Sequence, residues 1–139
     1  MDLVIIESPY AGDIEKNTEY ARLAVRDSLN RGEAPMASHL LYPQPGILRE
    51  EVPEERAWGI AAGLEWRLRA DKQAFYVDNG WSGGMLAAWT AANGPSSRGI
   101  LCVLRSIHHN DFHKMLLDAP PEVQASYQVE GRPWLRVRE

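Results

Sequence analysis

The sequence predicts a single α/β domain, residues 1–139, with a mainly parallel sheet of four or five strands flanked by helices, as in Rossmann-like folds. Short continuous apolar runs, typical of strands buried on both faces, alternate with longer segments of helical apolar spacing. A length of 139 residues suits one domain. No internal repeat, low-complexity segment or linker interrupts the alternation, which therefore favours right-handed strand–helix–strand crossovers.

The chain is expected to begin with a buried strand and a long amphipathic helix. The strand is the apolar run Leu3-Val4-Ile5-Ile6. Helical spacing then predicts a helix from about Ile14 to Arg31, with Asp13 as its N-cap and Gly32 as its stop. A second strand is expected from Met36 to Leu41, closed by a loop rich in proline and glycine.

The same alternation continues to the C-terminus. A second helix should begin at Pro53, because proline suits the first helical turn, and end near Arg69. Its apolar stripe consists of Ala57, Ile60, Ala61, Leu64 and Leu68. The remaining expected elements are strands from Gln73 to Val77 and Ile100 to Leu104, helices from the glycine-rich turn to Gly94 and from Asn110 to Leu117, and tail strands at Ser126 to Val129 and around Leu135 and Val137.

Composition narrows the class of protein. Hydrophobic content of 45% and charged content of 24% are ordinary for a globular domain. A net charge of −4 argues against a surface that coats nucleic acid, which would need to be basic. The single cysteine, Cys102, lies in an apolar run and predicts a buried, inert thiol in a reducing compartment. No run approaches the roughly 20 apolar residues that span a bilayer, so a soluble, cytoplasmic protein without a membrane partner is expected.

Three predicted loops should meet at one edge of the sheet. In parallel α/β sheets, ligands bind outside the carboxyl ends of the strands. The loops from Glu7 to Asp13, from Ser38 to Gly46 and from Asp78 to Gly84 each follow a predicted strand. Their polar residues are therefore expected to converge on one cleft.

The first two loops contain candidate ligand-binding residues. Glu7, Ser8 and Tyr10 could bind a sugar or a base, and the alternative is an ordinary turn with a packed ring. His39 could donate to a ligand or transfer a proton. A histidine satisfied by backbone groups is the alternative for His39.

Further acidic residues are candidates for chemistry. Glu54, Glu55 and Arg56 could supply an acid and a clamp, although a charged first helical turn is usually a solvated cap. Asp78 ends an apolar strand beside a glycine-rich turn, where an acid could meet ribose hydroxyls. Its alternative is an Asx-type turn with Asn79.

The turn Ser82-Gly83-Gly84-Met85 precedes a predicted helix. Backbone N–H groups at a helix N-terminus favour an anion such as phosphate. Glycines that only make a tight turn are the alternative, and spacing alone does not decide between the two.

Histidines and tryptophans give weaker signals. His109 and His113 are four residues apart, so they would share one face of a helix. The residue after His109 is Asn110 and not the glutamate of a zinc-protease motif, so no metal or cofactor is predicted. The tryptophans are expected in the core or a subunit interface rather than in a base-stacking platform. These residues are His108, His109 and His113, with Asn110 in the motif position, and Trp58, Trp66, Trp81 and Trp89.

Several segments resemble the nucleoside 2-deoxyribosyltransferase-like superfamily, which includes the deoxynucleoside 5′-monophosphate N-glycosidases. The similar segments run from Gly63 to Asp71, from Ser82 to Gly84 and from Gly99 to Arg105. The similarity as a whole runs from the first strand to about Val129. Small uncharacterised phage or bacterial relatives are more similar still, at Glu7–Tyr10, Ser38–Tyr42, Pro53–Arg56 and Ser82–Met85.

The resemblance implies a retained binding site without the usual catalytic residues. The family nucleophile, a glutamate, falls on Ala88, the assisting aspartate on Gly63 and a family tyrosine on Ile5. Ser82, with the backbone around the next two glycines, matches the phosphate-binding turn, and His39 matches a histidine of the second loop. The superfamily forms homodimers with sites near the interface, so a homodimer is expected.

Two functional hypotheses remain open. The first is a protein that binds a nucleotide or nucleoside in order to sense, sequester or carry it, without the ancestral chemistry. The second is an active N-glycosidase or deoxyribosyltransferase with relocated acids, for which Glu7, Asp78, Glu54 and Glu55 are the candidates. A protein-interaction module is a third alternative that only the tryptophans suggest.

Overall fold

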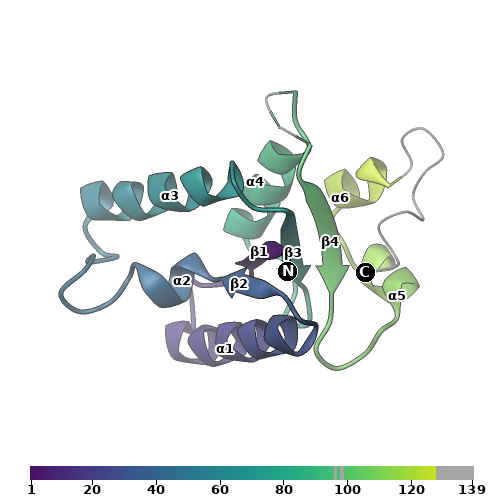
Figure 1. Ribbon diagram of the computed structural model, residues 1–139, viewed down its shortest axis with the longest axis horizontal. Helices are drawn as coiled ribbons and strands as arrows, with labels where there is room; N and C mark the ends of the chain where they lie inside the picture. Colours follow the sequence, from purple (N-terminus) through teal and green to yellow (C-terminus); the bar gives the residue numbers. More distant parts are fainter. Residues whose placement is uncertain (96, 98, 128–139) are drawn as a thin grey trace.

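A computed structural model confirms the α/β class (Figure 1). It describes residues 1–95, 97 and 99–127. In this part of the chain four strands form one parallel sheet in the order β2-β1-β3-β4. The strands are β1 (Leu3–Glu7), β2 (Ala34–Met36), β3 (Lys72–Tyr76) and β4 (Leu101–Arg105).

Helices connect the parallel strands and cover the sheet (Figure 1). After β2 the chain passes to the other side of β1, so the direction of strand addition reverses between β1 and β3. In α/β sheets such a switch point opens a crevice at the carboxyl ends of the strands. The helices are α1 (Ile14–Asn30), α2 (Ser38–Leu41), α3 (Pro53–Arg67), α4 (Gly83–Ala92), α5 (Phe112–Leu117) and α6 (Pro121–Ser126).

Local sequence signals set the ends of several elements as predicted. Asp13 accepts a hydrogen bond from the Lys16 backbone N–H and caps α1, and Gly32 adopts a positive φ of 81° just beyond its end. Pro53 occupies the first turn of α3. Such caps satisfy backbone groups that the helix leaves unpaired.

The core lies in two layers, one on each face of the sheet. On one face α1 packs against β1, β3 and β4, and its Tyr20 and Ala24 are buried there. On the other face α4, α5 and α6 enclose an aromatic cluster around Trp89, which contacts Phe75, Trp81 and Tyr127. Cys102 is fully buried in this second layer, as its apolar run predicted.

A buried ion network lies on the α1 face of the sheet. Glu33 accepts two hydrogen bonds from the Arg105 guanidinium, at 2.8 and 2.7 Å, and one from Lys72 at 2.9 Å. Ser28 of α1 donates to the same carboxylate at 2.8 Å. Burial acts to raise the Glu33 pKa, but these hydrogen bonds outweigh burial and bring the pKa to about 2. The network therefore joins α1 to β2, β3 and β4.

None of the 15 residues of helix α3 is buried, although α3 is one of the two longest helices in the described part of the chain. Figure 1 shows α3 extending away from the sheet, with its first turn at the far end. The predicted apolar stripe is open to solvent, with Ile60 56% exposed and Leu64 44% exposed. The opposite side contacts the segment after α2, where Trp66 donates to the Tyr42 hydroxyl at 2.9 Å.

Two expected elements were placed wrongly. The second strand is β2, Ala34–Met36, and the apolar Ser38–Leu41 that follows forms the single turn of α2. Ser126 ends helix α6 and does not begin a strand, because Pro121 starts a helix where the proline pair was read only as a stop. His109 precedes α5, so it does not share a helix face with His113. The expected strands at 128–129 and around Leu135 and Val137 lie outside the described residues.

Candidate functional site

The first two loops meet above the carboxyl ends of β1 and β2. The rings of Tyr10 and His39 stack with centroids 4.8 Å apart and planes inclined by 22°. Burial lowers the pKa of His39, and a hydrogen bond to the Ser8 backbone opposes this shift. Neutral imidazole is therefore favoured, and its contacts with Ser8 and Tyr10 give His39 a structural role here.

Asp78 follows β3 and holds three segments together. Its carboxylate accepts hydrogen bonds from the hydroxyls of Tyr20 and Ser106, and from the backbone N–H groups of Ile107 and His108 at 2.9 and 3.2 Å. Burial raises the Asp78 pKa, but these donors outweigh it, so the pKa lies below its ordinary value. This carboxylate is a saturated acceptor that fixes the loop after β4.

The glycine-rich turn begins helix α4 at the carboxyl edge of the sheet. Ser82 is the N-cap, and its hydroxyl accepts from the Met85 backbone N–H at 3.1 Å. The backbone N–H groups of Gly83 and Gly84 have no hydrogen-bond partner within the described residues. A Cβ added at Gly83 would meet nothing within 4 Å. Both glycines are exposed, so two unpaired donors lie at the solvent-accessible, positive end of a ten-residue helix.

Glu7, at the end of β1, has fewer hydrogen-bond donors around its carboxyl group than Asp78 has. Its register partner is Phe75, so its side chain lies on the face of the sheet that α4 covers. It accepts one hydrogen bond, from the Gln73 amide at 2.5 Å. Burial raises its pKa to about 7, although Gln73 and the nearby Arg67 act to lower it. Nη1 of Arg67 and Oε1 of Gln73 are buried without a hydrogen-bond partner among the described residues.

The raised pKa of Glu7 implies that the free energy of unfolding depends on pH. The folded state binds a proton at Glu7 more tightly than the unfolded state, whose glutamate titrates near 4.5. Stability from this residue is therefore full below about pH 4.5 and is lost as the pH rises to about 7. We expect Glu7→Gln to stabilise the protein at pH 8 by roughly 2 kcal/mol relative to its effect at pH 5. Urea unfolding at both pH values measures this difference.

The exposed Glu54 provides the control for this prediction. Glu54→Gln makes the same substitution at an exposed position of α3 and is measured at the same two pH values. A Glu7→Gln variant with the same pH profile as the wild type would contradict a raised pKa of Glu7 in the folded state.

Glu54, Glu55 and Arg56 lie at the outer end of α3, far from the sheet in Figure 1. Glu55 accepts hydrogen bonds from the backbone and guanidinium of Arg49 at 2.6–2.9 Å. Arg56 forms an ion pair with Glu50 at 3.3 Å. The protomer therefore does not bring these residues to the loops that follow β1 and β3.

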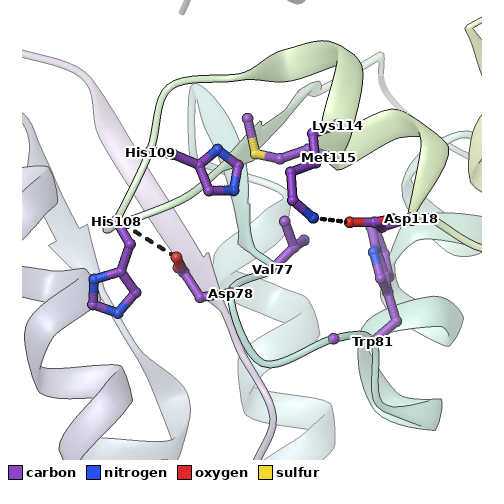
Figure 2. A pocket seen from close by; sticks show the side chains of 9 residues that line it. Val77, Asp78, Trp81, His108, His109, Lys114, Met115 and Asp118 are labelled. Atoms are coloured by element: carbon purple, nitrogen blue, oxygen red, sulfur yellow. Dashed lines mark hydrogen bonds and ion pairs between the residues drawn. The ribbon is translucent and has the colours of Figure 1, made fainter.

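A cavity of about 250 Å³ lies between the loop after β3 and helix α5, and we call it the α5 pocket (Figure 2). Its lining includes Trp81, His109, Lys114, Met115 and Asp118. Sequence spacing disfavoured His109 as a metal ligand, and it favoured Trp81 as a core or subunit-interface aromatic over a base-stacking platform. Trp81 follows β3 and His109 follows β4, and these strands are adjacent and parallel. This order in the sequence was the signal that could have predicted that the two residues lie close together. Among the described residues, no three of the histidine, cysteine and acidic side chains come close enough to hold a metal ion.

A family model for a domain of unknown function, DUF7768, matches residues 2–98. The chain belongs to this family. The DUF7768 match includes β1, β2, β3 and α4, and therefore Glu7, Asp78 and the Ser82 turn. Strand β4 and helix α5 lie beyond it. A search of curated proteins found no match. No helix in the described part of the chain is long and apolar enough to cross a membrane.

Proposed function

We propose that this DUF7768 protein binds a nucleotide or nucleoside at the carboxyl edge of its sheet, and that it senses, sequesters or carries this ligand. The observation that supports the proposal best is the pair of N–H groups of the exposed Gly83 and Gly84 at the start of α4, which have no hydrogen-bond partner within the described residues. A phosphate oxygen would accept from both groups and would lie at the positive end of the helix dipole. The resemblance to the deoxyribosyltransferase-like superfamily adds the ligand class.

The catalytic residues of the deoxyribosyltransferase-like superfamily are absent from the matching positions, which favours binding without reaction. Ala88 is half-buried on α4 where the resemblance puts the nucleophile, and it packs against the core. Neither Ala88 nor Gly63 can attack an anomeric carbon or transfer a proton. A binding role needs only the turn and its neighbours.

Variants of the turn test the proposal. We expect Gly84→Leu to abolish binding of a deoxynucleoside 5′-monophosphate, because its side chain would fill the space beside the free N–H groups. Ser82→Ala should weaken affinity by roughly three- to tenfold by loosening the first turn of α4. Isothermal titration calorimetry measures both effects.

The matched control is Asp13→Ala, which removes the equivalent cap from α1. It should lower stability by about 1 kcal/mol, as Ser82→Ala does, and leave nucleotide affinity unchanged. Wild-type affinity in both Ser82→Ala and Gly84→Leu would place the ligand elsewhere and refute the proposal.

An active N-glycosidase or deoxyribosyltransferase is the second candidate, and Glu7 favours it. Asp78 is saturated by hydrogen bonds and Glu55 is held by Arg49, whereas Glu7 has one neutral donor and a pKa near 7. A carboxyl group of this kind can serve as a general acid or, once ionised, as a nucleophile toward an oxocarbenium-like centre. Chromatographic detection of free base that disappears in Glu7→Gln would support this candidate, and no release by the wild type would exclude it for the substrates tried.

We further propose that α3 forms the interface of a homodimer. A 15-residue helix is marginal without tertiary packing, yet its stripe of Ile60, Leu64 and Leu68 is 56%, 44% and 40% exposed. Burial of the same stripe from two copies would satisfy the requirement for a self-complementary apolar patch.

The double variant Ile60→Glu/Leu64→Glu tests this interface. Light scattering should show a dimer for the wild type and a monomer for the variant, because two charges would be desolvated in each half of the interface. Leu23→Glu on α1 is the control, since Leu23 is 51% exposed but lies on a different helix. A wild-type monomer at working concentration, or a dimer that survives the double substitution, would refute the proposal.

A further inference from the structure

The α5 pocket is separate from the residues that the proposed phosphate contact uses. It lies on the same face of the sheet as α4, between Val77 and Trp81 of one loop and Met115 of α5 (Figure 2). Its volume of about 250 Å³ is below the usual range for whole drug-sized ligands and suits a single ring system. We propose that the α5 pocket binds a planar heteroaromatic ring of the size of a purine or pyrimidine base.

The floor and one wall of the pocket are apolar and polarisable. Trp81 is fixed by stacking on Phe75, with centroids 5.5 Å apart, and by an edge contact with Trp89 at 5.7 Å. Met115 is buried and also lines the cavity. An indole and a thioether both interact favourably with an aromatic ring, and a rigid indole loses little entropy on binding.

His109 supplies a directional hydrogen-bond donor. Its Nδ1 accepts from the Asp111 backbone N–H at 3.1 Å, so the neutral imidazole carries its hydrogen on Nε2. Figure 2 shows the His109 ring directed toward Met115 and Val77, whereas the neighbouring His108 ring points away. Nε2–H of His109 can therefore donate to a ring nitrogen or carbonyl oxygen of a bound base.

The charges around the pocket favour a neutral ring over an anion. Lys114 is paired with Asp118 at 2.6 Å, so this lysine brings no net charge to the pocket. The Asp78 carboxylate is likewise saturated by four donors. A phosphate would have to break the lysine pair, while a base would use the pair as one donor and one acceptor at its edge.

Trp81 directly precedes Ser82, the N-cap of α4. One nucleotide could therefore place its base in the α5 pocket and its phosphate at the Ser82 turn. The choice of a nucleobase rests on the proposed function, but free bases test the pocket without the phosphate contact.

The experiment titrates adenine and uracil into the full chain and follows backbone amide resonances by NMR. Binding of at least one base should shift the resonances of Trp81, His109 and Lys114. His109→Ala should weaken this binding by roughly three- to tenfold, because it removes one hydrogen bond. His109→Gln retains an N–H donor of similar reach and should preserve much of the affinity.

His113→Ala is the control, because His113 is exposed on α5 and does not line the pocket. It should bind the base as the wild type does. Absence of shifts with both bases, or equal affinity in wild type and His109→Ala, would overturn the proposal. Ser82→Ala and Gly84→Leu should bind the free base normally. Binding of free base without binding of nucleoside monophosphates would therefore refute the phosphate site alone, and the reverse would refute the α5 pocket alone.

Discussion

Replacement of Glu33 by alanine is expected to lower the free energy of unfolding by about 3–5 kcal/mol. Glu33 is 6% exposed and compensates the buried Arg105, which is 2% exposed, as well as Lys72. The variant leaves both cations without this carboxylate in a region from which water is excluded. Urea denaturation measures the loss, with the exposed Glu122→Ala as a control that should stay within about 0.5 kcal/mol.

A compensating variant sharpens this prediction. Glu33→Leu/Arg105→Met removes the buried pair and replaces it with apolar side chains, so it should be more stable than Glu33→Ala. The Glu33 contribution is also pH-dependent. Because its folded pKa is depressed to about 2, the contribution is full above about pH 4.5 and is lost as the pH falls through 2. An equal effect of Glu33→Ala at pH 7 and pH 2 would contradict this account.

Replacement of Asp78 by alanine is expected to lower the free energy of unfolding by about 3 kcal/mol. The variant removes the acceptor shared by Tyr20, Ser106 and the backbone N–H groups of Ile107 and His108. Hydrogen bonds to a charged group contribute about 1.5–3 kcal/mol each, and part of this is recovered when the loop opens to water. Thermal or urea unfolding measures the effect.

Asp78→Asn is the matched variant, because an amide keeps one acceptor oxygen but loses the charge. It should have an intermediate effect. A loss below about 0.5 kcal/mol for Asp78→Ala would show that the loop does not depend on this carboxylate. The structural role also affects functional assays, since base release that disappears in Asp78→Ala could reflect a displaced loop. Glu7→Gln is for this reason the more informative variant for catalysis.

Sequence patterns predicted most of the fold because they report local preferences directly. The apolar runs at Leu3–Ile6, Gln73–Val77 and Ile100–Leu104 correspond to β1, β3 and β4. The apolar pattern predicted the wrong residues for β2. This strand consists of only three residues, one of which is Pro35. The longer apolar run beside it forms a helical turn, and short apolar runs do not distinguish strand from buried helix.

The candidate site was predicted only in part. Parallel alternation placed Glu7, His39 and the Ser82 turn at one edge, and the stacking of Tyr10 on His39 confirms that the first two loops meet. The alternation of strands and helices could not show which acidic residue has many hydrogen-bond partners and which has few. Glu7 ends β1 and Asp78 follows β3, yet Glu7 accepts from a single amide and Asp78 accepts from four donors, because those partners come from segments distant in the sequence.

The sequence by itself determined the α/β class, the ends of α1 and α4, and the edge of the sheet at which the candidate loops lie. These features follow from periodicity, capping residues and strand direction, which are local or topological. Tertiary structure alone decided that α3 leaves its apolar stripe exposed, that Glu33 and Arg105 pair across 72 residues, and that Trp81 and His109 line one pocket. The physical reason is that burial and pairing depend on which segments pack together, and one-dimensional spacing does not encode those contacts.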